Sequence, residues 1–423
     1  MMILFLLAYV ALVLIRPQEY PGMESFPVPV LPLALLAALG AWLATPGRKR
    51  FDQPTYPLLL AFIAVCMASM VASGWTGGAL VRLQEFLPTL IAFVLVAQAA
   101  RDPRNLLRLM AVIALCAGVM ALHGVEQAQL GEGWTGIPTI QDGRIQYVGI
   151  FNDPNDLAMV FVIGLPFALL LSGAGGLRRL AWWALALLLV YGIYLTDSRG
   201  AFLAVMLMAG LWVWRRRGLL TAGILGVAGL SVLMMLPTRL QELDASEASA
   251  YGRIDAWYEG IQMFIANPLL GVGMNNFGDY HHLTAHNSFV LVLAETGLVG
   301  FTLWLAFVGY AFMMALAVLR HRPALAGPAD VARLRDERTA ATTLLLALAG
   351  FFACAFFLSR SYVIVLYVLV GLVTGWYAGA RDRWPGLPVF GVAGDLPKWG
   401  MLALGGAVVL WLLVKVLLMM AWS

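Results

Sequence analysis

Residues 56–73 have the sequence YPLLLAFIAVCMASMVAS, which contains no charged side chain. A helix needs about 20 apolar residues to cross a bilayer, so this stretch is long enough for one span. Comparable apolar runs follow one another along the chain, at residues 2–15, 28–45, 83–100, 106–128, 155–173, 180–197, 199–214, 218–236, 297–319, 339–358, 361–379 and 400–419. We therefore expect an all-α, polytopic helical membrane protein with about 12–13 transmembrane helices.

The composition supports this class. Hydrophobic residues make up 61% of the chain and charged residues 12%, outside the range of soluble globular proteins. The first run leads directly into Arg16-Pro17-Gln18 without a small-residue cleavage site, so we expect a retained span rather than a removed signal peptide. The three cysteines lie inside predicted spans and suggest neither a disulfide nor a metal site.

Most of the 27 Lys and Arg residues fall on one side of the predicted topology, at residues 48–50, 101–108, 178–179, 215–217, 320–338 and 381–398. Cytoplasmic loops are enriched in Lys and Arg, so this side and the amino terminus are predicted to be cytoplasmic. A count of thirteen spans places the carboxyl terminus outside. The outer side is acidic overall, so anion binding there would depend on individually placed arginines.

Two predicted outer segments are too long to be simple connections, residues 131–156 and 237–285. In the second, apolar residues recur at helical spacing over residues 249–266, which predicts an amphipathic helix on the membrane surface. In the first, residues 144–148 alternate and predict a short extended element. We expect a single integral membrane domain, residues 1–423, in which these loops form an outer cap.

Two polar motifs border predicted spans on the outer side. Residues 285–289, AHNSF, place His286 before an apolar run, and histidine is the side chain best suited to proton transfer near neutral pH. Residues 196–200, TDSRG, form the tip of a tight hairpin and present Arg199. Arg199 is either a fixed cation for an anionic substrate or a residue that reaches the lipid headgroups or pairs with Asp197.

Several function classes are disfavoured. Residues 271–273, GVG, follow no strand and lack a Gly-Lys-Ser/Thr, so we expect no nucleotide, and no solvated basic stripe with aromatics indicates nucleic acid. A transporter of lipid-linked glycans is the competing class, but transporters tend to carry ionisable residues at mid-span, whereas charges here lie at span ends. A structural scaffold of the envelope is a third class.

Three segments resemble the hallmark region of the O-antigen ligase and polymerase superfamily: residues 267–273 (NPLLGVG), 286–289 (HNSF) and 293–300 (LAETGLVG). Residues 198–200, Arg253 and residues 153–155 (DPN) are similar to further family features. The resemblance in order and topology covers most of the chain, whereas the specific motifs cover about residues 250–300. The family usually has an even number of spans, from which the count of thirteen departs.

The resemblance implies a glycosyltransferase of the bacterial inner membrane with its active site on the periplasmic face. The implied donor is a glycan on undecaprenyl diphosphate. A ligase transfers the glycan to the lipid A core, whereas an O-antigen or exopolysaccharide polymerase transfers it to another repeat unit; we favour the ligase. A diphosphate leaves without protonation, so the enzyme needs a base for the acceptor hydroxyl and cations for the leaving group.

His286 is the candidate catalytic base, with a helix-initiating, packed histidine as the alternative. Arg199 and Arg253 are the candidate diphosphate ligands, because guanidinium groups bind phosphate oxygens bidentately and stay charged. For Arg253 the alternative is an ion pair with Asp255 or Glu259. No cofactor is expected.

The secondary candidates each have a structural alternative. Arg82 can pair with Glu85 on one helix, Arg360 can mirror Arg199 or reach the headgroups, and Asn287 can orient His286 or cap a helix. Arg144 lies in the first long loop, where Trp134, Tyr147 and Phe151 are candidates for stacking on sugars, and Asn155 belongs to the DPN motif. His281 and His282 are further candidate catalytic residues.

A carboxylate is the chief rival to His286 as the base, with Asp153, Asp156, Asp197, Asp255, Glu259 and Glu295 all predicted outside. Metal-dependent transfer would need a compact cluster of acids such as Asp-x-Asp, which the outer segments lack. We therefore expect activity without a divalent cation.

Overall fold

The computed structural model describes residues 1–23, 28–47, 49–235, 243–324 and 327–421. Within this part the chain is helical and contains no strand, and only two isolated bridges, Glu132 with Pro138 and Ile140 with Arg144, interrupt the loop at residues 131–153. Every predicted apolar run corresponds to a helix. The all-α, polytopic class is therefore confirmed.

The long helices are α1 (Met2–Ile15), α2 (Val30–Ala44), α3 (Thr55–Ala72), α4 (Thr76–Ala99), α5 (Pro103–Leu130), α6 (Pro154–Leu171), α7 (Gly176–Thr196), α8 (Arg199–Arg217), α9 (Leu219–Met235), α10 (Leu243–Ala266), α12 (Ser288–Arg320), α13 (Pro328–Ala355), α14 (Ile364–Arg383) and α15 (Val392–Ala421). The short α11 (Phe277–Tyr280) precedes the His286 motif.

Ten helices of the described chain are long and apolar enough to cross a membrane. The predicted count of 12–13 also included α2 and α9, whose apolar stretches are shorter, and α8, which carries four arginines at its ends. The predicted helix at residues 249–266 is longer, because α10 begins at Leu243 and ends, as expected, before Asn267-Pro268. The predicted loop residues 237–242 lie outside the described residues.

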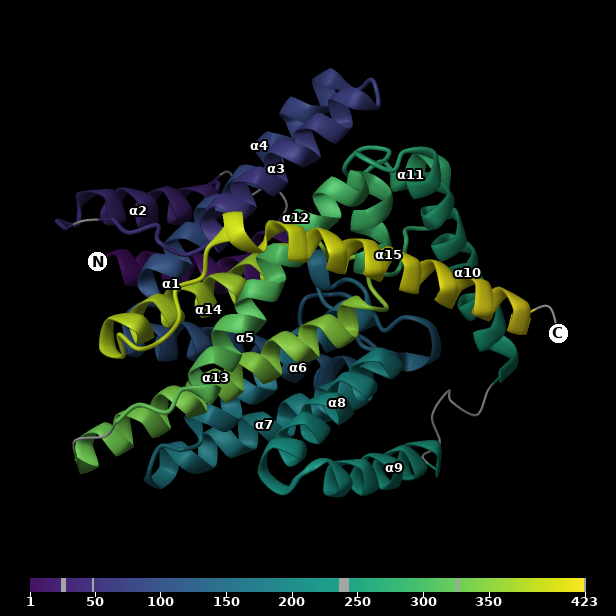
Figure 1. Ribbon diagram of the computed structural model, residues 1–423. Coiled ribbons are helices and arrows are strands. Elements are labelled where there is room, and N and C mark those ends of the chain that lie inside the picture. The colour runs from purple at the N-terminus through teal and green to yellow at the C-terminus, as the bar shows by residue number, and fades with distance from the viewer. Residues whose placement is uncertain (24–27, 48, 236–242, 325–326, 422–423) are drawn as a thin grey trace.

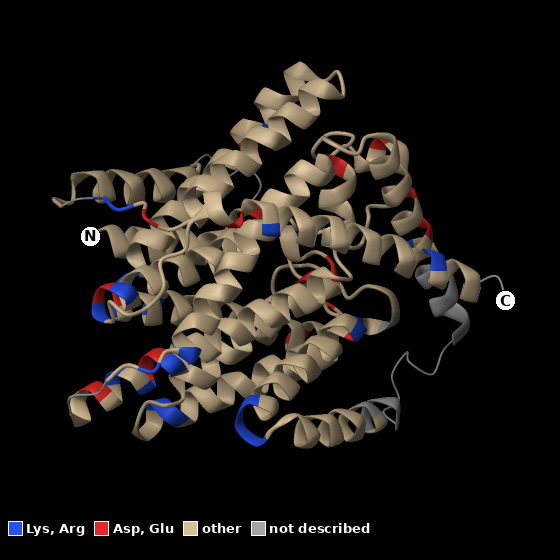
Figure 2. Ribbon diagram, viewed as in Figure 1, with Lys and Arg blue, Asp and Glu red and all other residues tan. Residues whose placement is uncertain are grey.

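The two termini lie at opposite ends of the molecule (Figure 1). Lys and Arg gather at the ends of α7, α8 and α13 on one side (Figure 2). The far end of α15 lies against α10, with Lys415 over the ring of Tyr258 at 5.8 Å.

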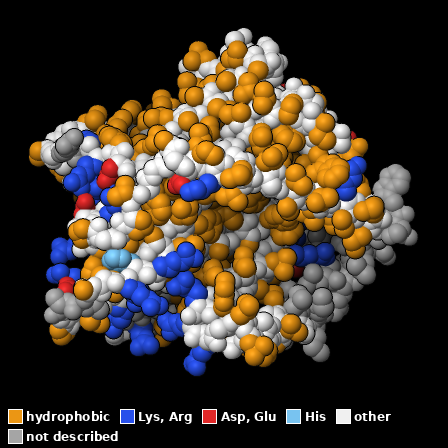
Figure 3. Space-filling model, viewed as in Figure 1, with side chains coloured by type: hydrophobic (Ala, Val, Ile, Leu, Met, Phe, Trp, Pro, Cys, Tyr) orange, Lys and Arg blue, Asp and Glu red, His pale blue; other side chains and the backbone are white. Residues whose placement is uncertain are grey.

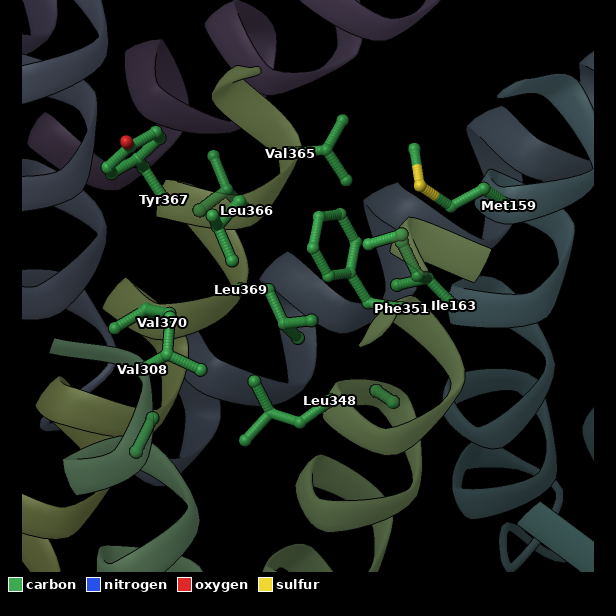
Figure 4. Packing of buried hydrophobic residues seen from close by; sticks show 14 of the residues in the cluster. Met159, Ile163, Val308, Leu348, Phe351, Val365, Leu366, Tyr367, Leu369 and Val370 are labelled. Atoms are coloured by element: carbon green, nitrogen blue, oxygen red, sulfur yellow. The ribbon is translucent and has the colours of Figure 1, made fainter. Parts of the chain in front are cut away.

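Hydrophobic side chains cover much of the surface of the bundle on the side shown in Figure 3. They also fill its centre, where α14 is almost wholly buried against α4, α12 and α13. Phe351 of α13 lies among Met159 and Ile163 of α6 and Val365 of α14 (Figure 4). In a bilayer, packing of this kind rather than water exclusion holds helices together.

Small residues let α14 approach α4 closely. Gly371, Gly375 and Gly379 lie on one face of α14, four residues apart. A Cβ atom on Gly371 would lie 3.1 Å from the carbonyl oxygen of Phe93, and one on Gly375 would overlap that of Ala97. Glycine at these positions allows the two backbones to touch.

Helix α12 has a sharp kink, and the segment that follows α10 is hydrogen-bonded to it. Gly297 has φ 61° and ψ −167°, a conformation that strongly favours glycine. The freed backbone groups bond to the preceding loop: the N–H of Leu298 donates to the carbonyl of Pro268 (2.8 Å), and the N–H of Val272 donates to that of Ala294 (3.0 Å). The hallmark segments at residues 267–273 and 293–300 are thus hydrogen-bonded to each other.

Candidate active site

Three helices begin at the candidate site, and each has a side-chain cap. Asp153 caps α6, Ser198 caps α8 and Asn287 caps α12, each accepting a hydrogen bond from a backbone N–H of the first turn. Helix amino termini carry partial positive charge and unpaired N–H groups. Three of them at one place favour an anionic ligand.

Side-chain hydrogen bonds join these three helix starts. The hydroxyl of Ser198 donates to Oδ1 of Asn155 at 2.8 Å, which joins α8 to α6. The guanidinium of Arg360 binds both carboxylate oxygens of Asp156 on α6, and its backbone N–H donates to the hydroxyl of Ser288 on α12 at 2.8 Å. Residues distant in the sequence are therefore fixed at one site.

His286 directly precedes the cap of α12 and has φ 46°, which is uncommon for a residue with a side chain. Contacts on both sides hold this backbone. The hydroxyl of Thr284 donates to that of Ser359 at 2.5 Å, and the hydroxyl of Ser361 donates to the carbonyl of Ser288 at 2.8 Å. The turn between α13 and α14 thus holds the chain on both sides of His286, which is half-buried.

The surroundings of His286 favour its neutral form. Burial lowers the pKa of His286 below its usual range, the charges of Arg253 and Arg360 lower it further, and Asp153 opposes them. At pH 7 the imidazole is therefore neutral and has a lone pair to accept a proton. A neutral ring at this position meets the first requirement of a general base.

Arg253 projects from α10 into the same group of charges. Burial lowers its pKa, Asp153 opposes this, and Arg144 and Arg199 lower the pKa further. Within the described chain Arg253 forms no ion pair, so the predicted alternative pairing with Asp255 or Glu259 is absent. The guanidinium groups of Arg144, Arg199 and Arg253, which come from separate elements, are thus close enough to repel one another.

Among the described residues, no carboxylate is bonded to Arg144. Its Nε donates to the carbonyl of Thr196 at 2.8 Å, and its Nη2 donates to Oδ1 of Asn155 at 3.3 Å. Asn155 also donates from Nδ2 to Oδ1 of Asp153 at 3.0 Å, so its amide connects three residues. We name Arg144, Arg199, Arg253, Arg360 and His286 together the arginine–histidine site.

Two of the secondary candidates, Arg82 and Asn287, make structural contacts. Arg82 lies on α4 and pairs with Glu85 at 2.7 Å, as the structural alternative predicted. Asn287 is a helix cap; its Oδ1 accepts from the N–H groups of Phe289 and Val290, and its Nδ2 is buried without a partner in the described chain.

His281 binds Asp255 at 3.1 Å. Burial works against its charged form, but hydrogen bonds to Asp255 and to the carbonyl of Leu283 raise the pKa of His281. A histidine that favours its charged form is a poor general base, and neighbouring His282 is exposed.

Sequence reasoning missed the partnership of Arg360 with Asp156. Arg360 was expected to mirror Arg199 or to reach the headgroups, but Asp156 neutralises it, and the two residues are 204 positions apart. Sequence reasoning considered Asp153 as a rival base and as part of the DPN motif, but not as a helix cap; its carboxylate caps α6 and acts on Arg253 and His286. The Asp-Pro pair, a common helix start, is the signal that could have identified this cap.

No group of three or more His, Cys, Asp or Glu residues with metal-binding geometry occurs in the part of the chain that the structure describes.

Residues 184–305 match the sequence model of a family described as O-antigen ligase. The matched segment contains Arg199, Arg253 and His286, whereas Arg144, Asp153 and Arg360 lie outside it. No curated protein matches the chain. The similarity supports the superfamily of O-antigen ligases and polymerases, and with it a multi-pass membrane glycosyltransferase of this general type.

Proposed function

We propose that this protein is an O-antigen ligase of the bacterial inner membrane. In this proposal it transfers a glycan from undecaprenyl diphosphate to a hydroxyl group of the lipid A core, on the periplasmic face. The observation that carries the proposal is the half-buried position of His286 before α12, where α6 and α8 also begin and where the charge of Arg253 lowers the pKa of His286. A base next to concentrated positive charge is what transfer from a lipid diphosphate needs.

The reaction follows from these groups. An acceptor hydroxyl gives its proton to the neutral imidazole of His286 as its oxygen bonds to the anomeric carbon. The bond from that carbon to the diphosphate oxygen breaks, and its electron pair stays on the diphosphate. Arg199 and Arg253 stabilise this developing charge, as a metal ion does in other enzymes that use diphosphate sugars. A single displacement inverts the anomeric configuration, and the imidazolium then releases its proton to water.

The topology supports the periplasmic assignment. The arginine-rich ends of α7, α8 and α13 lie away from the arginine–histidine site (Figure 2). Because cytoplasmic loops are enriched in Lys and Arg, this arrangement supports a cytoplasmic amino terminus and a site on the opposite face. Lipid-linked donor and lipid A core would both be presented to the site from the membrane.

The test is transfer by the purified protein in lipid nanodiscs. A lipid-diphosphate glycan is offered together with either lipid A core or a second lipid-linked unit. Glycan on lipid A core supports the ligase, whereas a lengthened lipid-linked chain supports a polymerase of the same superfamily. Absence of transfer to either acceptor, with protein that remains folded, would remove the enzymatic proposal.

A further inference from the structure

The first long loop begins with a tightly held turn, residues 131–139. The N–H of Thr139 donates to the carbonyl of Gly131 (2.9 Å), and that of Gly133 donates to the carbonyl of Ile137 (3.1 Å). The side chain of Gln127 on α5 donates to the carbonyls of Ile137 and Pro138, at 2.8 and 3.0 Å. The turn is therefore fixed to the end of α5.

Trp134 lies at the tip of this turn, where its side chain is 49% exposed. The backbone N–H of Trp134 donates to Oε2 of Glu126 at 2.8 Å. The indole ring packs edge to face on the buried ring of His123, with centroids 4.9 Å apart. The next residue, Thr135, is hydrogen-bonded to Nε2 of His123 at 2.8 Å. An exposed aromatic ring is thus held in place by a buried support.

Trp134 is the aromatic residue of this loop that a ligand can reach. Tyr147 and Phe151, the other two candidates for stacking on sugars, are 0% and 1% exposed. Tyr147 also packs against the ring of His123, edge to face with centroids 4.9 Å apart, and its hydroxyl bonds to that of Tyr20 at 2.6 Å. The buried aromatics support the exposed one.

The groups beside Trp134 indicate the class of ligand. Glu126 is bonded to its backbone, and Glu132, two residues earlier, is exposed. Carboxylates repel phosphates and are costly to bury among acyl chains, so neither an anionic headgroup nor a lipid tail suits this position. A sugar ring has an apolar face that packs on indole and hydroxyl groups that donate to carboxylates.

We propose that Trp134, with Glu126 and Glu132, binds a sugar ring of the glycan at a distance from the reacting bond. The inference rests on the proposed function in taking the ligand to be the transferred glycan or its acceptor. The loop that carries Trp134 continues to Arg144 and to Asp153, the cap of α6, which connects this subsite to the arginine–histidine site. This subsite would orient the saccharide without taking part in the chemistry.

The test measures saccharide binding without transfer. The probe is the polysaccharide released by mild acid from the cells that make the protein, titrated into protein in nanodiscs and followed by saturation-transfer NMR. We expect Trp134→Ala to weaken binding about tenfold, the equivalent of about 1.4 kcal/mol, and Trp134→Phe to stay within about threefold of wild type. Trp75→Ala is the matched control, because Trp75 is 47% exposed at the start of α4.

The inference is overturned if the wild type does not bind the polysaccharide, or if Trp134→Ala binds it as the wild type does while remaining folded in a thermal melt. Equal losses in Trp134→Ala and Trp75→Ala would also overturn it. His286→Ala separates the two proposals, since it should lower transfer about 1000-fold and keep saccharide binding. If His286→Ala retains transfer while Trp134→Ala loses binding, the proposed catalytic base fails and the saccharide site stands.

Discussion

At the end of the bundle opposite the arginine–histidine site, guanidinium groups are bonded to carboxylates. Arg50 and Arg101 both bind Asp382, at 2.8 and 3.4 Å, and Arg383 binds the buried Glu337 at 2.6 Å. The same Glu337 accepts from the indole N–H of Trp376 at 2.8 Å. These charges serve the packing of α4, α13 and α14.

At the arginine–histidine site the bonding is different. Arg253 has no ion pair within the described chain, and Arg144 bonds to a carbonyl and an amide rather than to a carboxylate. Arg360 is neutralised directly, by Asp156. Guanidinium groups that are not tied to acids keep donors for an anionic ligand, which suggests that one set of arginines serves structure and the other serves binding.

The strongest test of this difference is the imidazole itself. We expect His286→Ala to lower the transfer rate about 1000-fold, because the acceptor hydroxyl loses its base. His282→Ala, at an exposed residue of the same loop, should keep wild-type activity. If His286→Ala retains most of its activity, the base lies elsewhere, with Asp153 the first alternative to examine.

Substitution of Arg253 tests whether the arginines of the arginine–histidine site serve ligand binding. Arg253→Gln should reduce transfer about 100-fold, because charge on the leaving diphosphate is no longer stabilised. Its melting temperature should be close to that of the wild type, since no ion pair is broken. A large loss of stability with unchanged activity per folded molecule would assign Arg253 to structure instead.

Substitution of Arg383 tests whether the arginines at the opposite end of the bundle serve the stability of the fold. Arg383→Gln leaves the carboxylate of Glu337 buried without its cation, so we expect a loss of about 3 kcal/mol in the free energy of unfolding. Transfer per folded molecule should change little, because the residue is at the far end of α14. Arg322→Gln, which breaks no ion pair of the described chain, is the control. Wild-type stability in Arg383→Gln would contradict the comparison.

Asp153 tests the electrostatics of the base. Its charge raises the pKa of His286, so Asp153→Asn should lower that pKa further. The imidazole then stays neutral to more acidic pH, and the acid side of the pH–rate profile should move to lower pH. Asparagine also caps helices, so α6 should be retained. A move to higher pH would show that Asp153 does not act on His286 in this way.

The smallest expected effect is that of a chelator. If arginines alone balance the diphosphate, excess EDTA should leave the transfer rate unchanged. Activity that is lost with EDTA and restored by magnesium or manganese would contradict a metal-free mechanism.

Local patterns in the sequence predicted much of this molecule. The apolar runs identified the long helices, and Asn267-Pro268 correctly predicted the end of α10. Long-range contacts were not predictable in this way. The bond between Asp156 and Arg360 depends on how α6 meets the turn after α13, and neither residue carries a local signal of the other. The sequence also contained no signal that the backbone around Gly271 and Gly273 is hydrogen-bonded to α12 on both sides of Gly297.

The kink at Gly297 has a consequence for the spacing of the site. The loop after α10 bonds to α12 on both sides of this glycine, through Val272 and Gly273 on one side and Leu298 and Val299 on the other. Arg253 lies on the helix that enters this junction, and His286 precedes the helix that contains it. The spacing of His286 and Arg253 therefore depends on hydrogen bonds around Gly297, more than two turns after the start of α12. In hydrogen-exchange experiments the amides of these four residues should open together, as one cooperative unit.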